Sequence, residues 1–223
     1  MSATRAQRLA AEAIGTSLLL AAIVGSGIMG ERLAAGNAAI ALLANSVATG
    51  CALATLIAVL GPVSGAHFNP IVTLSLAARG EFPRGLALPY VAVQLASAVA
   101  GVVLAHFMFG EPALAYSTKA RAGVHQLASE FVAAFGLMLV VWACIRVRLA
   151  SAPALIAAWI VAAYWFTAST SFANPAVTLA RCLTDTFAGI RPADVLPFVA
   201  AQVAGAAAAT GAAMWIFGKP EAG

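Results

Sequence analysis

The chain has 223 residues, of which 62% are hydrophobic and 9% charged, and its mean hydropathy is +0.95. Soluble domains contain about 45–50% apolar and about 25% charged residues, so this composition excludes a soluble globular protein and indicates one embedded in a lipid bilayer. The net charge of +4 is scattered along the chain, without the basic runs interleaved with aromatics that nucleic-acid binding needs.

Six apolar stretches are long enough to be membrane spans, since crossing a bilayer takes about 20 residues. The first follows Arg5 and Arg8 and resembles a signal peptide, but it is longer than the roughly 7–15 apolar residues of such a peptide, so we expect an uncleaved span. In chain order the predicted spans cover residues 9–29, 37–60, 86–109, 127–145, 151–167 and 195–217. The fold class expected is therefore an all-α membrane protein.

Two further apolar segments begin at Asn69 and Asn174 and are too short to cross. Each starts with Asn-Pro. Asparagine is a strong helix N-cap and proline suits the first helical position, so each motif predicts the start of a short helix. Short interrupted apolar segments at corresponding places in two halves indicate re-entrant half-helices.

The two halves of the chain resemble each other. AEAIGTSLLL around Glu12 is similar to SEFVAAFGLMLV around Glu130, and PYVAVQLASAVAG is similar to PFVAAQVAGAAAA. We expect one channel domain over residues 1–223, with a first repeat at 1–110 and a second at 123–218. Each repeat holds three spans, so the second lies inverted in the membrane relative to the first.

Basic residues predict the orientation, because cytoplasmic loops carry an excess of Lys and Arg. With the N-terminus inside, seven basic residues lie on the cytoplasmic side and five outside. The cytoplasmic set is Arg5, Arg8, Arg79, Arg84, Arg146, Arg148 and Lys219. We expect both termini in the cytoplasm, and a plasma membrane or bacterial inner membrane as the location.

The inversion brings one half-helix in from each face, so that their N-termini meet near the midplane. Irregular backbone at that depth is tolerated where it lines a wet cavity. The expected central constriction consists of Asn69, Pro70, Ile71, Asn174, Pro175 and Ala176. Backbone carbonyls are expected to line the pore at Gly65, Ala66, His67, Ser171, Phe172 and Ala173. Helix N-termini carry roughly +0.5 of a charge, which opposes cations and favours passive conduction of neutral polar molecules.

These motifs resemble those of the aquaporin and aquaglyceroporin (major intrinsic protein) family over essentially the whole chain. The resemblance is carried by SGAHFNP, by the second NPA, by Glu in the first and fourth spans, and by Gln in the third and sixth. It implies a homotetramer in which each subunit has its own pore. It also implies that Glu12 and Glu130 are buried carboxylates bracing the re-entrant loops, with no part in acid–base chemistry. An intramembrane enzyme is a further alternative, but no Ser/His/Asp set and no metal-spaced His/Cys cluster supports it, so we expect no enzyme.

The chain departs from the family at the selectivity filter. Val177 stands where most relatives have arginine, and counting from the motifs places the other filter residues at Thr49, Ala162 and Ser171. These four side chains include no aromatic ring and no charge, so we expect a wider, less polar filter. Three bulky side chains remain candidates for narrowing it, namely Phe68, Phe166 and Phe172.

A wide filter favours glycerol, urea and metalloid hydroxides such as arsenous acid, together with methylated arsenicals, as solutes. In lacking the filter arginine, the chain resembles the bacterial metalloid-permeable branch of the family. A water-selective channel is the alternative, and an inverted-repeat secondary transporter is a remote one. We expect no cofactor and no metal, because the three cysteines and three histidines show no ligand spacing.

Two ionisable residues near the motifs leave alternatives open. Arg181 follows Val177 by one helical turn, and is either a displaced positive charge in the outer vestibule or a side chain that snorkels to the interface. His67 precedes Asn69 by two residues and is either a proton relay or a neutral hydrogen-bonding group of the pore.

Overall fold

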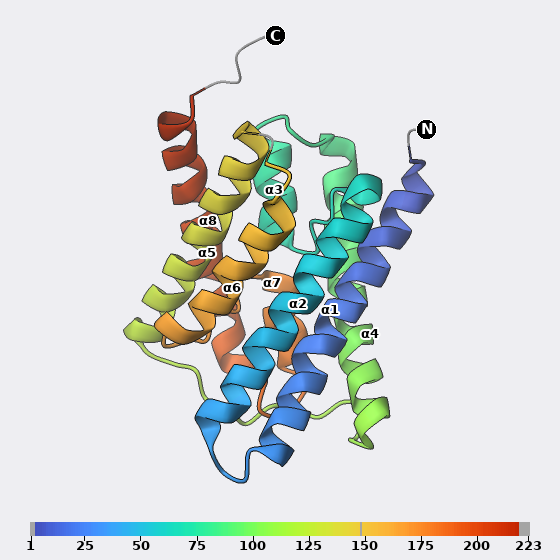
Figure 1. Ribbon diagram of the computed structural model, residues 1–223, viewed down its shortest axis with the longest axis vertical. Helices are drawn as coiled ribbons and strands as arrows, with labels where there is room; N and C mark the ends of the chain where they lie inside the picture. Colours follow the sequence, from blue (N-terminus) through green and yellow to red (C-terminus); the bar gives the residue numbers. More distant parts are fainter. Residues whose placement is uncertain (1–2, 148, 219–223) are drawn as a thin grey trace.

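The computed structural model describes residues 3–147 and 149–218. Arg148 and Lys219, which contribute to the predicted orientation, lie outside these residues. The described part contains eight α-helices and no strand (Figure 1). In chain order they are α1 (Arg5–Leu33), α2 (Ala38–Ser64), α3 (Pro70–Ala78), α4 (Arg84–Phe109), α5 (Val124–Val147), α6 (Ala152–Phe166), α7 (Pro175–Arg181) and α8 (Pro192–Ile216).

Five of these helices are long and apolar enough to span a membrane, with 24 to 29 residues each. The sixth predicted span, at residues 151–167, forms the 15-residue helix α6. At 1.5 Å per residue α6 is about 22 Å long, shorter than the hydrocarbon core of about 30 Å. The all-α membrane fold is confirmed, and one of its six predicted spans is shorter than expected.

The two predicted half-helices are α3 and α7, of nine and seven residues. Each begins after an asparagine N-cap with proline in its first turn, as expected. Their N-termini lie in the middle of the bundle and their C-termini point to opposite ends (Figure 1). The end where α1 begins and α8 ends is called the terminal face here, and the opposite end, with residues 110–123 and 182–191, the loop face.

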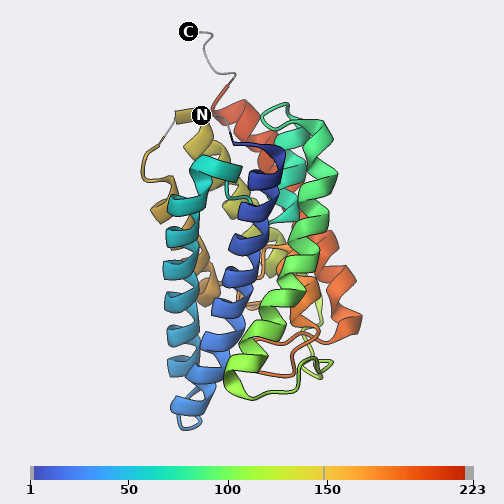
Figure 2. The same ribbon diagram turned by 90° about the vertical axis from the view of Figure 1, so that its right-hand side faces the viewer.

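The helices make equivalent contacts in the two halves. α1 packs between α2 and α4, as Figure 2 shows, and α5 packs between α6 and α8. Glycines permit the closest of these approaches: a side chain on Gly101 of α4 would meet the carbonyl of Ser17, and one on Gly205 of α8 the carbonyl of Phe131. The half-helices fill the space between, where α3 contacts α4 and α8 and α7 contacts the same two helices.

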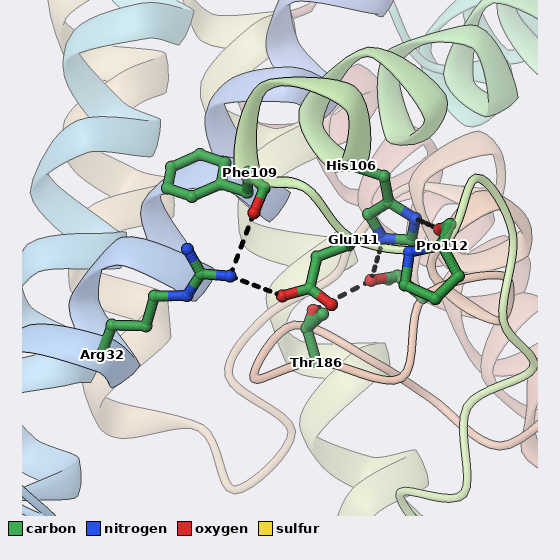
Figure 3. Close-up of polar contacts among 7 residues, drawn as sticks. Arg32, His106, Phe109, Glu111, Pro112 and Thr186 are labelled. Carbon is green, nitrogen blue, oxygen red and sulfur yellow. Dashed lines mark hydrogen bonds and ion pairs between the residues drawn. The ribbon is translucent and has the colours of Figure 1, made fainter.

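Polar contacts tie the loops together at the loop face (Figure 3). Arg32, at the end of α1, forms a 2.7 Å ion pair with Glu111. His106 donates from Nδ1 to the carbonyl of Pro112 at 2.6 Å, and its Nε2 lies 2.7 Å from the hydroxyl of Thr184. The segment after α4 is thereby fixed both to α1 and to the loop that follows α7.

Candidate functional site

The two half-helices are joined by reciprocal bonds between their asparagines. Asn69 donates from Nδ2 to the carbonyl of Ala173 at 2.9 Å, and Asn174 donates from Nδ2 to the carbonyl of Phe68 at 2.8 Å. Each Oδ1 accepts from the backbone N–H of the second residue of its own half-helix, at 3.1 and 2.9 Å. Since an amide has two N–H donors, each asparagine keeps one that has no partner within the described residues.

Glu12 holds the loop before α3. Its carboxylate accepts from the hydroxyl of Ser64 at 2.8 Å, from the backbone N–H groups of His67 and Phe68 at 2.9 and 2.8 Å, and from the amide of Gln94 at 2.8 Å. The side chain is fully buried. Four donors compensate for the removal of this carboxylate from water, which a buried charge requires.

Glu130 does the same for the loop before α7. It accepts from the backbone N–H groups of Phe172 and Ala173, both at 2.9 Å, and from the amide of Gln202 at 2.6 Å. Gln202 also donates to Thr178 in α7 at 2.8 Å. Both carboxylates are thus placed as braces of the re-entrant loops, in equivalent positions of the two halves.

The braced loops have an unusual backbone. Ala66 and Phe68 before α3, and Ser171 and Ala173 before α7, have φ between 47° and 51°. Left-handed backbone costs non-glycine residues about 1–2 kcal/mol each, and the carboxylate bonds offset this cost. The remaining carbonyls of these loops, among the described residues, accept no hydrogen bond at Gly65, Ala66, His67, Ser171 and Phe172. The Ala173 carbonyl differs, because it already accepts from Asn69.

A cavity of about 210 Å³ follows the two loops through the bundle. Its lining extends from Cys144 and Ala152 near the terminal face, past both asparagines, to Arg181 toward the loop face. Most of the wall is apolar. The predicted residues that line it are Thr49, Gly65, Ala66, His67, Phe68, Asn69, Ser171, Phe172, Ala173, Asn174, Val177 and Arg181.

Four residues of the predicted constriction do not line this cavity: Pro70, Ile71, Pro175 and Ala176 are buried behind the asparagines. Ile71 and Ala176 belong to hydrophobic clusters of the bundle. Of the motif residues at this depth, only the two asparagines therefore present polar side chains to the cavity. The residues that follow them pack the half-helices against the rest of the bundle.

The placement of Ala162 in the filter is corrected by the structure. Ala162 is exposed on the outside of α6, in a shallow groove with Val140 and Trp159. The face of α6 that lines the cavity carries Ile156, Ile160 and Tyr164. Two residues correspond to about 200° of a helix with 3.6 residues per turn, so the counted position fell on the opposite face.

Tyr164 is one of the cavity residues that counting from the motifs missed. Its ring is buried, and its hydroxyl lies 3.4 Å from the hydroxyl of Thr49. The spacing Ile156, Ile160, Tyr164 is a helical stripe that the sequence contains, and it was the available signal. An aromatic ring therefore stands beside Thr49, contrary to the expectation of a filter without one.

The three candidate phenylalanines have different places. Phe166 is 54% exposed and points away from the cavity. Phe68 also lines the cavity, and its ring occupies the space beside Gly15 of α1. Phe172 lines the cavity, and its ring packs edge-on against Phe198 at 5.4 Å between centroids. Of the three, Phe172 is the one whose ring also contacts a charged group of the cavity wall.

That charged group is Arg181. Its side chain is 2% exposed, lines the cavity, and has its guanidinium carbon 3.4 Å from the centroid of the Phe172 ring. Nε donates to the carbonyl of Ala188, and Nη1 has no hydrogen-bond partner among the described residues. Arg181 is therefore enclosed by protein and does not snorkel to the interface.

A second guanidinium lies on the same aromatic ring. Arg121, in the segment before α5, is 4.8 Å from the Phe172 centroid and donates to the carbonyls of Gly189 and Ser169 at 2.8 and 3.0 Å. Burial lowers the pKa of Arg121 to about 10, so it stays charged at neutral pH. The loop-face end of the cavity is consequently electropositive.

His67 lines the cavity before α3. Its Nδ1 lies 3.0 Å from the hydroxyl of Thr73, and its ring packs against those of Phe82 and Tyr90, at 4.7 and 5.4 Å between centroids. With aromatic rings on one side and a hydroxyl partner, His67 is placed as a hydrogen-bonding group of the cavity wall.

Known proteins resemble this chain in sequence and in fold. Residues 1–170 match the family described as major intrinsic protein. The chain is 52% identical over 210 residues to aquaglyceroporin AqpS of Rhizobium meliloti (strain 1021), covering 94% of this chain and 90% of that one. It is 37% identical over 145 residues to aquaporin NIP1-4 of Oryza sativa subsp. japonica, covering 64% of this chain and 52% of that one. The solved structure of the aquaglyceroporin from Plasmodium falciparum shares its fold, with a TM-score of 0.76 at 18% identity over 96% of both chains.

Proposed function

The chain belongs to the major intrinsic protein family of membrane channels, and on this premise we propose that it conducts small uncharged solutes of the glycerol type passively through the cavity between its half-helices. The observation that carries the proposal is the row of polar groups along one side of an otherwise apolar cavity. These groups are the free carbonyls of the two loops and one free N–H on each of Asn69 and Asn174.

Such a wall favours neutral molecules with hydroxyl groups. A solute gives up hydrogen bonds to water and regains them in the cavity singly, each with a net value of about 0.5–1.5 kcal/mol, so no deep trap forms. An ion would lose its hydration to a few neutral acceptors, which costs several kcal/mol. Fast passage of hydroxylated solutes and rejection of ions follow from the same geometry.

The solutes we propose are glycerol, urea and metalloid hydroxides such as arsenous acid, with methylated arsenicals as larger members. Thr49, Ser171 and Val177 form the wall near Arg181 with short side chains. A valine at position 177 leaves open the space that an arginine would fill. The 52% identity to an aquaglyceroporin supports the polyol part of this proposal.

One observation favours a second candidate, a water-selective channel. Tyr164 brings a ring and a hydroxyl to the wall beside Thr49, where a bulky side chain would narrow the cavity. The two functions differ in whether solutes larger than water pass. A transporter finds less support, because the intramembrane carboxylates Glu12 and Glu130 are both occupied as braces.

The test is stopped-flow light scattering of vesicles reconstituted with the native protein or with Val177→Arg, with empty vesicles as background. Water, glycerol and arsenous acid are compared at equal osmotic gradients. The proposal expects the native protein to pass all three and Val177→Arg to lose glycerol and arsenous acid while still passing water. Native vesicles that pass water alone would establish the water-selective alternative.

We also propose the assembly and orientation. The protein is an integral membrane protein, and we place both termini in the cytoplasm and four subunits in the assembly, each with its own cavity. Large apolar side chains on the outer surface, such as Leu88, Leu196 and Trp215, would face lipid or neighbouring subunits. Crosslinking of the reconstituted protein, and labelling of single cysteines introduced at the loop face in intact cells, test these two points.

A further inference from the structure

We propose that this channel assigns size selection and charge selection to two different residues of α7: Val177 leaves the pore wide, and Arg181, one turn further toward the loop face, excludes cations. The inference rests on the proposed conduction of neutral solutes and adds a specificity-determining residue to it.

The geometry separates the two positions. Residues four apart lie on one face of a helix, and both side chains line the cavity. Four residues correspond to about 6 Å along the helix axis. The charge therefore lies about one turn beyond the valine and does not occupy the section whose width the valine sets.

Among the described residues Arg181 forms no ion pair, and the nearby carboxylate that acts on its charge, Glu130, already accepts three hydrogen bonds from other donors. Within residues 3–147 and 149–218 the ion pairs are Arg32–Glu111, Arg146–Glu81 and Arg191–Asp194, and none includes Arg181. A buried cation that is held in no direct ion pair projects its field into the low-dielectric cavity that it lines. A cation entering from the loop face meets this field before it reaches the asparagines.

The arginine is also held in place. Phe172 covers one face of its guanidinium, and the carbonyl of Ala188 accepts from Nε. Nη1 is buried without a hydrogen-bond partner among the described residues, which is costly unless water or a solute oxygen accepts from this guanidinium. Arg181 thus offers N–H donors to the oxygen atoms of a neutral solute at the same place where it repels cations.

The experiment compares two fluxes through vesicles of the reconstituted protein. Glycerol permeability is measured by stopped-flow. Cation leak is measured as proton movement driven by a potassium diffusion potential, and a pH dye enclosed in the vesicles reports it. The variants are Arg181→Met and Arg181→Gln, which remove the charge, Arg181→Lys, which keeps it, and Val177→Arg. Lys119→Met is the matched control, because it removes one positive charge from the exposed loop face outside the cavity.

The expected result is a separation of the two effects. Both neutral variants of Arg181 raise the ratio of cation leak to glycerol permeability about tenfold or more, whereas Arg181→Lys and Lys119→Met keep the native ratio. Val177→Arg lowers glycerol permeability and leaves the cation leak at its native level. The double variant Val177→Arg/Arg181→Met regains cation exclusion, because the charge then lies in the narrow section.

Two results would overturn the inference. The first is a neutral Arg181 variant that conducts glycerol and remains as tight to cations as the native protein. The second is an equal rise in the leak ratio for Lys119→Met, which would make the effect one of general surface charge. Native vesicles without glycerol flux contradict the proposed function instead, and Arg181→Gln, which keeps a donor for Ala188, separates loss of charge from loss of folding.

Discussion

Glu130→Gln tests the bracing role of the buried carboxylates. The carboxylate accepts three hydrogen bonds, two from the loop before α7 and one from Gln202. A glutamine of the same shape retains one oxygen, which can keep the two donors at Oε2, and turns an NH₂ group toward the N–H of Phe172. One hydrogen bond to a charged group is lost and the others become neutral, so we expect a loss of about 2–4 kcal/mol in the free energy of unfolding.

The consequence for conduction comes from the backbone. Ser171 and Ala173 have positive φ, and each is disfavoured by about 1–2 kcal/mol without compensation. Once its N–H partner is lost, the loop relaxes and its carbonyls leave the cavity wall. We therefore expect slower glycerol flux together with a lower melting temperature in detergent.

The control for this prediction is Glu111→Gln. That glutamate pairs with Arg32 at the partly exposed loop face, where an ion pair contributes about 0–1 kcal/mol. Its variant should melt and conduct nearly as the native protein does. If Glu130→Gln melts and conducts like Glu111→Gln, the carboxylate is no brace, and its hydrogen bonds have another purpose.

Three further outcomes are expected. Gly205→Ala places a methyl group against the α5 backbone, and this overpacking should lower the melting temperature at a cost of about 1–3 kcal/mol. In the control Gly211→Ala, in the same helix, the new methyl group meets nothing within 4 Å, so the variant should be neutral or stabilising. Equal effects of the two substitutions would contradict the close approach of α5 and α8. Tyr164→Ala should raise permeability to polyols larger than glycerol relative to water in stopped-flow, and an unchanged solute cutoff would remove Tyr164 from the narrow part of the wall. Hydrogen bonds from Thr118 lower the pKa of Asp185 from its usual 3.8, so the contact stabilises the folded loop above pH 3.8 and loses this stabilisation as the pH falls through the lowered pKa. Protease digestion of residues 110–123 should therefore speed up on acidification. The variant Asp185→Asn should abolish this dependence on pH.

The half-helices were predictable because their signals are local. Asparagine caps the residues directly after it and proline is favoured in the first turn, so Asn69 and Asn174 predict α3 and α7 with little help from the rest of the chain. The exchange of hydrogen bonds between the two asparagines and the opposite loops was not predictable in this way. It depends on how two distant segments meet.

To predict which residues line the cavity, one must know which face of α6 points toward it. The position of Ala162 was counted backward from Asn174 across residues 167–174, whose path the sequence does not determine, and the count fell on the outer face of α6. The apolar stripe ending at Tyr164 depends only on helical period and was the better guide. The burial of Arg181 depends on the loop that supplies the Ala188 carbonyl, and no local sequence pattern predicts that this loop covers the arginine.

The reciprocal asparagine bonds also set the order in which the channel can be completed during synthesis. The carbonyl that accepts from Asn69 belongs to a residue 104 positions later. At about 5–20 residues per second, the ribosome needs about 5–20 s to make that stretch of chain. Throughout this interval the side chain of Asn69 lacks its acceptor, so the constriction between the half-helices is completed only after the second half of the chain has supplied it.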